Sequence, residues 1–397
     1  VRIIQMNQKR RKAIFGVAIF LLVMSIAWSG YIFFIQPLFY PSFQYATVGQ
    51  IIGDGGIKLP PAEPLITHLP TPESVRAIYL TSWVAGTSRL REPLIKLIDS
   101  TELNSVVIDI KDYTGRIAFK SGDRLLDESG AVEERVRDIE NFIRRLHEKN
   151  IYVIGRISVF QDSYFVSRQP ELAVRRRSDG LMWKDRKGIS WLEAGAIPVW
   201  DYTVRIAKAA HAGGFDEINF DYIRFPSDGD MKNISYRHFD PTLETRREVL
   251  KRFYVYLSRE LAPLHLPLSA DLFGLTTTSL DDLGIGQILV DAAPYFDYLA
   301  PMVYPSHFAS GFLNFSNPAT HPYEVVEHSM SSAAARLLAS SSTPNKLRPW
   351  LQDFDLGANY TAEMVRAQIE ATYAAGLTSW MLWNPSNRYT TAALNQY

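Results

Sequence analysis

The 397-residue sequence predicts an α/β fold: a (β/α)8 TIM barrel that follows one N-terminal transmembrane helix and a tether rich in Pro and Gly. Three observations predict it. An uncharged apolar stretch lies near the amino terminus, prolines interrupt the segment after it, and strand-like and helix-like segments alternate from Val75 onward. Alternation of this kind is typical of a parallel sheet whose strands are joined by helices.

The apolar stretch covers residues 13–35, AIFGVAIFLLVMSIAWSGYIFFI, and contains no charged side chain. As a helix it would span about 30 Å, the thickness of a bilayer's hydrocarbon core. Residues 1–12 carry five basic side chains and no acid, which predicts a cytoplasmic amino terminus. A signal peptide cleaved near Ala27–Ser29 is the alternative, but apolar residues continue beyond that site and favour an uncleaved anchor. In both cases the rest of the chain is exported.

Residues 36–74 are expected to be a linker, because their prolines and the Gly53–Gly56 turn interrupt any helical or strand period. Residues 75–397 are expected to form the globular body. This body carries 36 basic and 39 acidic side chains, so it has no basic footprint for nucleic acid. The absence of cysteine excludes disulfides and thiolate metal sites.

Eight strands are expected in the body. They are Arg76–Thr81, Ser105–Lys111, Ile151–Ser158, Glu217–Ile223, Leu268–Phe273, Tyr298–Tyr304, Arg348–Asp353 and Ser379–Trp383. Amphipathic segments between them predict helices at Val132–Lys149, Tyr202–Ala212, Leu243–Leu261, Asp281–Ala293, Tyr323–Leu338 and Thr361–Ala375. The longest expected loop covers residues 161–199 and is rich in Arg and Trp. An open doubly wound sheet is the alternative fold, but no Gly-rich phosphate loop follows the first strand.

The most informative stretch is residues 216–226, DEINFDYIRFP. Alternate residues of a strand share a face, so Asn219 and Asp221 point one way. Ile218, Phe220 and Tyr222 point the other. In a barrel enzyme, polar residues gather at the carboxyl ends of strands whose apolar residues pack under helices. We therefore interpret Asp221 as a catalytic acid.

Polar and aromatic residues recur at the carboxyl ends of the other expected strands. The second candidate catalytic acid is Asp271, and the candidate substrate-binding residues are Trp83, Asp109, Lys111, Arg156, Asn219, Arg224, Tyr304, His307, Asp353, Trp383 and Asn384. Pairs of carboxyl groups with aromatic walls suit sugar chemistry. One carboxyl group protonates the leaving oxygen while the other attacks or activates water, and rings stack on sugar faces.

Several of these residues fit structural roles as well. Asp109 and Lys111 share a strand face, so an ion pair between them fits the pattern as well as a catalytic role does. Asp353 is equally suited to capping a helix, and His307 to a hydrogen bond at the surface. Of the two tryptophans of the last strand, Trp380 and Trp383, one is expected to fill the barrel.

Five ordered motifs carry a family resemblance: IDIKDYTGRI, DEINFDYIRFP, LSADLFGLT, LAPMVYPSHF and WMLWNP. Together they resemble a glycoside hydrolase family whose domain was long catalogued as of unknown function. The resemblance covers about residues 75–385 and implies a TIM barrel that acts on carbohydrate. It also implies that Asp221 matches the family's acid within FDYIRFP and Asp271 its acid within SADLFG. The family supplies a class of reaction and no substrate.

We therefore expect a membrane-anchored, extracytoplasmic glycoside hydrolase of a cell-envelope or extracellular polysaccharide, held in the lipid bilayer by residues 13–35. Asp271 is expected to donate the proton and Asp221 to act as nucleophile or base, with the reverse order as the alternative. Arg224 is expected to stabilise the ionised form of the acid it touches. No cofactor is expected, since the eight histidines form no metal-binding motif. The alternatives are a non-catalytic glycan-binding barrel and a metal-dependent hydrolase with a carboxylate-only calcium or magnesium site.

Overall fold

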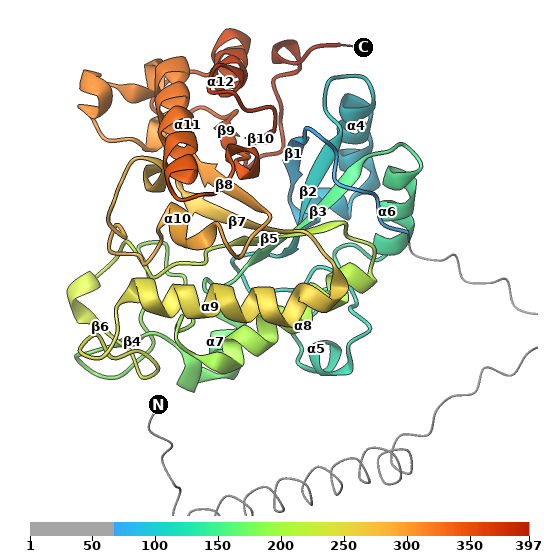
Figure 1. Ribbon diagram of the computed structural model, residues 1–397. Helices are drawn as coiled ribbons and strands as arrows, with labels where there is room; N and C mark the ends of the chain where they lie inside the picture. Colours follow the sequence, from blue (N-terminus) through green and yellow to red (C-terminus); the bar gives the residue numbers. More distant parts are fainter. Residues whose placement is uncertain (1–66, 397) are drawn as a thin grey trace, which may run out of the picture. The chain divides into compact units, whose positions relative to one another are not determined.

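The computed structural model describes residues 67–396, which fold around a closed barrel of eight parallel strands (Figure 1). The strands are β1 (Arg76–Leu80), β2 (Ser105–Lys111), β3 (Tyr152–Ser158), β5 (Glu217–Asp221), β7 (Leu268–Phe273), β8 (Tyr298–Met302), β9 (Trp350–Gln352) and β10 (Trp380–Trp383). β1 pairs with both β2 and β10, which closes the barrel and leaves it no free edge. The predicted TIM barrel is confirmed.

Helices surround the barrel. They are α3 (Ser82–Ala85), α4 (Ser88–Asp99), α5 (Arg124–Glu128), α6 (Ile139–His147), α7 (Ser163–Arg168), α8 (Ile197–Ala212), α9 (Arg246–Leu261), α10 (Leu289–Ala292), α11 (Pro322–Ala339) and α12 (Ala362–Ala374). α8 packs against α9 along one side of the barrel, and α11 packs against α12 along another (Figure 1). α9 begins with a capping box, in which Thr245 and Glu248 exchange hydrogen bonds and satisfy free backbone N–H groups.

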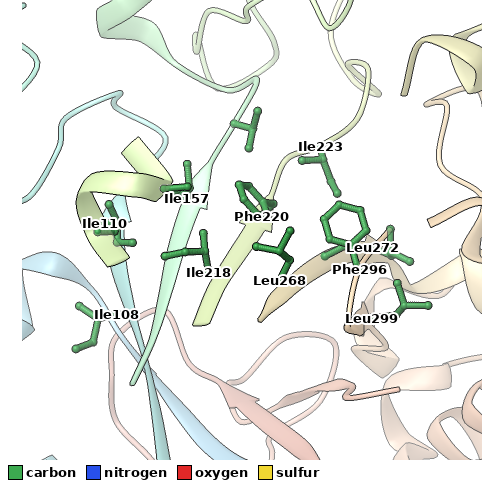
Figure 2. Packing of buried hydrophobic residues seen from close by; sticks show 14 of the residues in the cluster. Ile108, Ile110, Ile157, Ile218, Phe220, Ile223, Leu268, Leu272, Phe296 and Leu299 are labelled. Carbon is green, nitrogen blue, oxygen red and sulfur yellow. The ribbon is translucent and has the colours of Figure 1, made fainter. Parts of the chain in front are cut away.

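Strand alternation divides the apolar residues into two cores. One fills the inside of the barrel and includes Tyr79, Val107 and Ile154. The other lies between the strands and the helices, and Figure 2 shows Ile218 and Phe220 within it. The sequence-based assignment of these two β5 residues to the helix-covered face is therefore confirmed.

The register of the strands brings polar residues of neighbouring strands to one level of the barrel. Arg156 on β3 lies opposite Asp109 on β2 and Asn219 on β5. Asn219 in turn lies opposite Ser269 on β7. Because the strands are parallel, their carboxyl ends meet at one end of the barrel, and the residues that follow this level form its mouth.

The helices differ most from the sequence-based ones in three places. The helix expected at 132–149 begins only at Ile139, because Val132 forms a β-bridge with Ile117. The helix expected at 281–293 is reduced to α10, since Gly284 and Gly286 adopt left-handed backbone conformations before it. α4 was not anticipated at all. Apolar periodicity indicates that a helix exists better than it indicates where the helix starts.

The connection between β3 and α8 is the long one that the sequence predicts. It contains β4 (Arg175–Arg176), which pairs antiparallel with β6 (Ile234–Ser235) from the loop after β5. Both loops leave the barrel at the carboxyl ends of their strands, so the small β4–β6 sheet belongs to the same side of the barrel as the mouth. Figure 1 shows this sheet beyond the ends of α8 and α9.

The predicted membrane anchor, residues 13–35, and the basic tail before it lie outside the described residues. Of the predicted linker, only residues 67–74 are described. They run to β1 across the amino end of the barrel, where Leu69 N donates to Asp216 Oδ1 at 2.8 Å. From residue 67 to residue 396, no helix combines the length and the apolar character needed to span a bilayer.

Candidate active site

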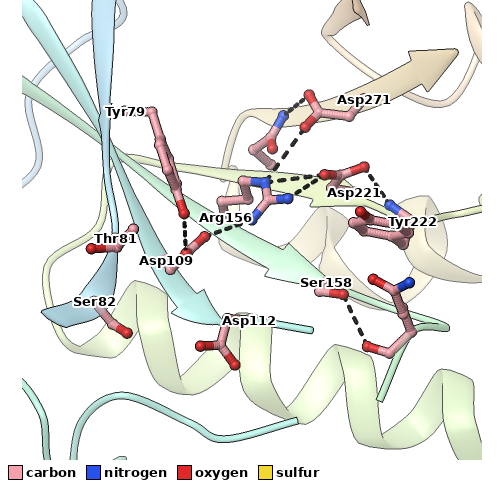
Figure 3. A network of polar contacts seen from close by, with 12 residues as sticks. Tyr79, Thr81, Ser82, Asp109, Asp112, Arg156, Ser158, Asp221, Tyr222 and Asp271 are labelled. Carbon is pink, nitrogen blue, oxygen red and sulfur yellow. Dashed lines mark hydrogen bonds and ion pairs between the residues drawn. The ribbon is translucent and has the colours of Figure 1, made fainter. Parts of the chain in front are cut away.

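Four charged side chains meet at the carboxyl end of the barrel (Figure 3). Arg156 Nη1 donates to Asp109 Oδ1 at 2.6 Å, while Nη2 and Nε both donate to Asp221 Oδ2. Arg156 Nε also lies 3.8 Å from Asp271 Oδ2. None of the four residues is more than 5% exposed. One buried guanidinium is thus shared by three buried carboxyl groups that come from three neighbouring strands.

This cluster contains more acid than base. Burial disfavours the charged guanidinium, but the carboxylates of Asp221 and Asp109 outweigh that cost and hold the pKa of Arg156 well above its usual range. Arg156 is therefore a permanent cation. Three ionised carboxylates around it would leave two uncompensated negative charges away from water, which is costly. The cluster accordingly favours a proton on one of its acids.

Asp271 is the acid best placed to keep that proton. Burial raises the pKa of Asp271 well above its usual range, and the negative charge of Asp221 raises it further. Asn219 Nδ2 and Trp350 Nε1 each donate to Asp271 Oδ1 at 2.8 Å. Since Oδ1 accepts two hydrogen bonds, a proton on this carboxyl group belongs on Oδ2, the oxygen that faces Arg156.

Asp221 is held in the opposite way, with N–H donors on both oxygens. Besides the bonds from Arg156 to Oδ2, Tyr222 N donates to Asp221 Oδ1 at 2.5 Å. Tyr222 adopts a left-handed backbone conformation, with φ of 52°, which a residue other than glycine rarely takes. This turn ends β5 at Asp221, two residues earlier than the sequence predicts. Charge-assisted bonds to both oxygens suit an ionised carboxylate.

The two acids are close enough to act on one bond. Asp221 Oδ2 lies 3.2 Å from Arg156 Nε, and Asp271 Oδ2 lies 3.8 Å from the same nitrogen. These two oxygens are therefore at most about 7 Å apart, a separation at which paired carboxyl groups can act on a single glycosidic bond.

The third acid, Asp109, has a partner that sequence reasoning missed. Tyr79 on β1 donates its hydroxyl proton to Asp109 Oδ2 at 2.5 Å. Burial raises the pKa of Tyr79, as does the neighbouring carboxylate of Asp109. Trp350, the donor to Asp271, was missed as well. Strand alternation is the signal that could have found both, because each lies two residues before a residue at its strand's carboxyl end.

Aromatic rings complete the inside of the mouth. The Trp383 ring stacks on Tyr79 with 4.0 Å between centroids, and its centroid lies 5.1 Å from Arg156 Cζ. Tyr304 is 6% exposed, and its pKa is raised by burial and by the nearby carboxyl groups of Asp271 and Asp221. Trp380 is instead fully buried between the barrel and α12, where its Nε1 donates to Tyr373 Oη at 3.0 Å. Trp380 is therefore not the tryptophan that fills the barrel, because it packs outside it; Trp383 is the one that packs against the apolar side chains inside.

Lys111 does not join the cluster, and the suggested ion pair with Asp109 does not form. A β-bulge shifts the β2–β3 register between these two residues, so that Asp109 pairs with Arg156 and Lys111 with Ile157. The extra residue turns Lys111 away from the barrel interior. Its Nζ lies 2.5 Å from Asp162 Oδ2, a fully buried carboxylate.

Arg224 lies at the edge of the mouth and contacts neither Asp221 nor Asp271. Its Nη1 donates to Phe225 O and to Ser227 Oγ, both at 3.1 Å, and its Cζ lies 5.0 Å from the Trp191 ring centroid. Between residues 67 and 396, Arg224 has no ion pair. The guanidinium that touches the acids is that of Arg156, and the role expected of Arg224 passes to it.

Trp83 and His307 lie at the surface around the mouth. Trp83 is 57% exposed, with the guanidinium carbon of Arg135 4.6 Å from its ring centroid. Arg135 is in turn held by Asp112, because its Nη1 donates a hydrogen bond to Asp112 Oδ2 at 2.6 Å. His307 is exposed and sits 5.2 Å from the Tyr304 ring.

Asp353 and Asn384 organise the loop that follows β10. Asp353 accepts hydrogen bonds from Thr390 N at 2.9 Å and from Thr390 Oγ1 at 2.6 Å. Asn384 Nδ2 donates to Arg388 O at 2.6 Å, and its Oδ1 accepts from Ser386 N at 2.8 Å. Asp353 thus has a structural role, but it binds the loop after β10 and does not cap a helix as anticipated.

Within residues 67–396, no three His, Cys, Asp or Glu side chains are arranged so that they could hold a metal ion. At the mouth, the place between the acids is taken by the Arg156 guanidinium. The chemistry available there is the transfer of a proton between buried carboxyl groups and a bound molecule.

Solved structures with TM-scores above 0.5 share this fold. The glycoside hydrolase domain of PgaB (BpsB) from Bordetella bronchiseptica is 14% identical with a TM-score of 0.57, over 78% of this chain and 94% of that one. Alpha-L-fucosidase isoenzyme 2 from Paenibacillus thiaminolyticus is 14% identical with a TM-score of 0.55, over 81% of this chain and 48% of that one. A hypothetical protein from Ruminiclostridium thermocellum is 34% identical with a TM-score of 0.43, over 52% of this chain and 98% of that one.

No curated protein matches the chain in sequence. A family model does, and it spans residues 77–389, from the first barrel strand to the loop after the last. The match covers the whole barrel and every residue of the buried acid cluster. The chain therefore belongs to the family described as "Putative glycosyl hydrolase domain".

Proposed function

We propose that this protein is a membrane-anchored, extracytoplasmic glycoside hydrolase that cleaves a polysaccharide of the cell envelope or the extracellular space. One observation carries the proposal: Asp221 and Asp271 converge on one guanidinium, yet their surroundings favour different protonation states. Two carboxyl groups with opposed environments are what general acid and nucleophile or base require. Family membership and the fold support the same reaction class.

In this mechanism Asp271 donates its proton to the glycosidic oxygen, and Asp221 attacks the anomeric carbon or activates water. When Asp271 loses its proton, the Arg156 cation 3.8 Å away and the two N–H donors on Oδ1 stabilise the new carboxylate. Asp109 accepts from Arg156 and Tyr79 and holds the guanidinium in place. Arg156, Asn219 and Trp350 are thus positioning residues for the acid pair.

Sugar binding is assigned to the aromatic side chains. Trp383 and Tyr304 line the inside of the mouth, while exposed Trp83 offers a ring at its rim. A ring that stacks on a sugar removes apolar surface of both from water. Lys111, Asp353 and Asn384 are left out of the substrate contacts, because each is engaged in a contact of its own elsewhere.

The test is the release of reducing ends from a panel of envelope and extracellular polysaccharides. The wild-type protein is expected to release them from at least one polymer, whereas Asp221→Asn and Asp271→Asn are expected to be inactive. Asp99→Asn is the matched control, since Asp99 is an exposed carboxylate on α4 that pairs only with Lys149. Equal activity in wild type and a folded Asp221→Asn protein would overturn the proposal.

A non-catalytic glycan-binding barrel is the second candidate. The near-complete burial of Asp221 and Asp271 favours it, because a substrate must reach groups that are 5% and 1% exposed. The same panel distinguishes the two functions. Retention of a polysaccharide by the wild-type protein, without release of reducing ends from any polymer, would establish glycan binding as the function.

The membrane anchor is part of the proposal and has its own test. Residues 13–35 supply an uncharged span behind a basic tail, an arrangement that leaves the amino terminus in the cytoplasm. Protease added to intact spheroplasts should then digest the barrel. Protection of the barrel until the cells are lysed would contradict export.

A further inference from the structure

A second candidate binding site lies on the small sheet formed by β4 and β6. A surface hollow of about 770 Å³ opens there, well within the size of ligand pockets in proteins. Its lining includes Arg175, Arg176, Leu181, Met182, Lys184 and Asp230. None of the four residues of the catalytic cluster belongs to this lining.

The hollow lies in the most basic part of an otherwise acidic domain. Residues 168–187 carry seven basic and three acidic side chains, whereas residues 75–397 as a whole carry 36 and 39. One of the three acids, Asp185, is buried and accepts hydrogen bonds from Gln161 and Trp191. The positive charge at the surface here is therefore largely uncompensated.

Most of the basic side chains in the lining form no ion pair within the described residues. Among the described residues, neither Arg175 nor Lys184 pairs with a carboxylate, and only Arg176 does so, through the exposed Asp179. Arg175 is fixed in position because its Nη1 donates to Gly180 O at 2.8 Å and its Nη2 to Pro170 O. Carbonyl oxygens hold the guanidinium without cancelling its charge.

We propose that this hollow binds anionic units of a polysaccharide, sugars that bear a carboxylate, sulfate or phosphate group. Arg175 and Lys184 would take the charged group, the apolar Leu181 and Met182 would cover a sugar face, and Asp230 can accept from hydroxyl groups. The claim that the bound polymer is also the substrate rests on the proposed function; binding at the hollow does not.

The hollow and the mouth belong to the same two loops. β4 lies in the connection after β3, which carries Arg156, and β6 lies in the loop after β5, which carries Asp221. The first of these loops also supplies Trp191, which packs edge-on against Tyr222 at 5.8 Å. A polymer anchored at the hollow is thereby held by the elements that shape the catalytic end of the barrel.

Affinity electrophoresis of the full chain in non-ionic detergent tests the proposal. Gels that contain polygalacturonate or alginate are expected to retard the wild-type protein more than gels that contain neutral dextran. Lys184→Glu reverses one charge in the hollow and should weaken binding to the acidic polymers by about five- to tenfold. Lys96→Glu makes the same change on α4, away from the hollow, and should leave the retardation unchanged.

Asp230→Asn should change the affinity for acidic polymers in the opposite direction. It removes a negative charge from the lining, so it should tighten binding about twofold, which a merely destabilised protein would not show. Equal retardation of Lys184→Glu and Lys96→Glu would overturn the proposal, as would equal retardation of wild type by acidic and neutral polymers. If retardation depends on Lys184 but no reducing ends are released, binding at the hollow is supported and only the proposed hydrolysis is contradicted.

Discussion

The two ends of the barrel interior each contain a buried arginine, and the two arginines differ in the number of carboxyl groups around them. At the amino end, Arg348 Nη1 lies 2.8 and 3.0 Å from the oxygens of Glu217, and Tyr152 donates to the same carboxylate at 3.2 Å. Arg348 also packs 3.9 Å from the Tyr298 ring centroid. At the carboxyl end, Arg156 faces three carboxyl groups at once.

The difference separates a structural ion pair from a reactive site. One acid for one base is electrically balanced, and burying such a pair holds strands together without leaving a proton to move. Three acids for one base cannot all ionise cheaply away from water, so the excess is accommodated as a raised pKa on Asp271. Perturbed pKa values of this kind are common at functional sites, which is consistent with the function proposed for the carboxyl end.

The largest expected effect concerns turnover. Asp221→Asn should lower the rate of polysaccharide hydrolysis by about three orders of magnitude, because a neutral amide neither attacks nor activates water. Glu217→Gln, the corresponding change at the amino end, should leave the rate of the folded protein within a few-fold of wild type. Initial rates on the same polymer measure both, and a similar loss in the two variants would erase the distinction between the ends.

The same pair of variants should differ in stability in the opposite order. Glu217→Gln leaves the Arg348 charge buried without a counter-charge and should lower the free energy of unfolding by about 3–5 kcal/mol. Asp221→Asn should cost less, since Arg156 keeps Asp109 at 2.6 Å. Urea denaturation monitored by tryptophan fluorescence gives both values. A larger loss in Asp221→Asn would mean that the acid cluster, not the Glu217 pair, anchors the barrel.

The sequence predicted the architecture of both ends but not how their charges are shared. Eight strand-like segments that alternate with helices suffice for the barrel, and period-two alternation places Asn219 and Asp221 inside it. The family motifs picked out both acids. Arg156 was expected only as a binding residue, because its reach across three strands depends on register, which one strand's sequence does not contain.

Local backbone irregularities account for the rest of the disagreement. The bulge in β2 turns Lys111 out of the barrel, and no residue type in the segment IDIKDY predicts a bulge there. The left-handed Tyr222 ends β5 early and swings Arg224 away from the acids. Tyr79 and Trp350 were missed because each contacts the cluster from a different strand, Tyr79 from β1 to Asp109 on β2 and Trp350 from β9 to Asp271 on β7.

A third prediction concerns pH and follows from the raised pKa of Asp271. A carboxyl group whose folded pKa lies above its unfolded value adds stability that is fully present below about pH 4 and is lost as pH rises through the folded pKa. Asp271→Asn cannot ionise, so the stability of wild type relative to this variant should fall as pH rises, by up to about 1.4 kcal/mol per pH unit.

Urea titrations of wild type and Asp271→Asn between pH 4 and pH 8 measure this slope. The exposed control Asp99→Asn should show a nearly constant difference from wild type over the same range. A constant difference for Asp271→Asn as well would mean that Asp271 ionises like an ordinary carboxyl group. Asp271 would then be no proton donor, and the carboxyl end would resemble the amino end.

The smallest expected effect on stability is that of Trp83→Ala, at the rim of the mouth. Trp83 is 57% exposed and its ring contacts Arg135, so its removal should cost only about 0.5–1 kcal/mol, the worth of an exposed cation–π contact. Trp380→Ala is the matched comparison, because that fully buried ring should cost about 3–5 kcal/mol. The effect on glycan binding should be the reverse of the effect on stability. Affinity electrophoresis should show weaker glycan retention for Trp83→Ala and unchanged retention for folded Trp380→Ala. Unchanged retention of Trp83→Ala would remove this ring from the substrate site and confine sugar contacts to the inner rings, Trp383 and Tyr304.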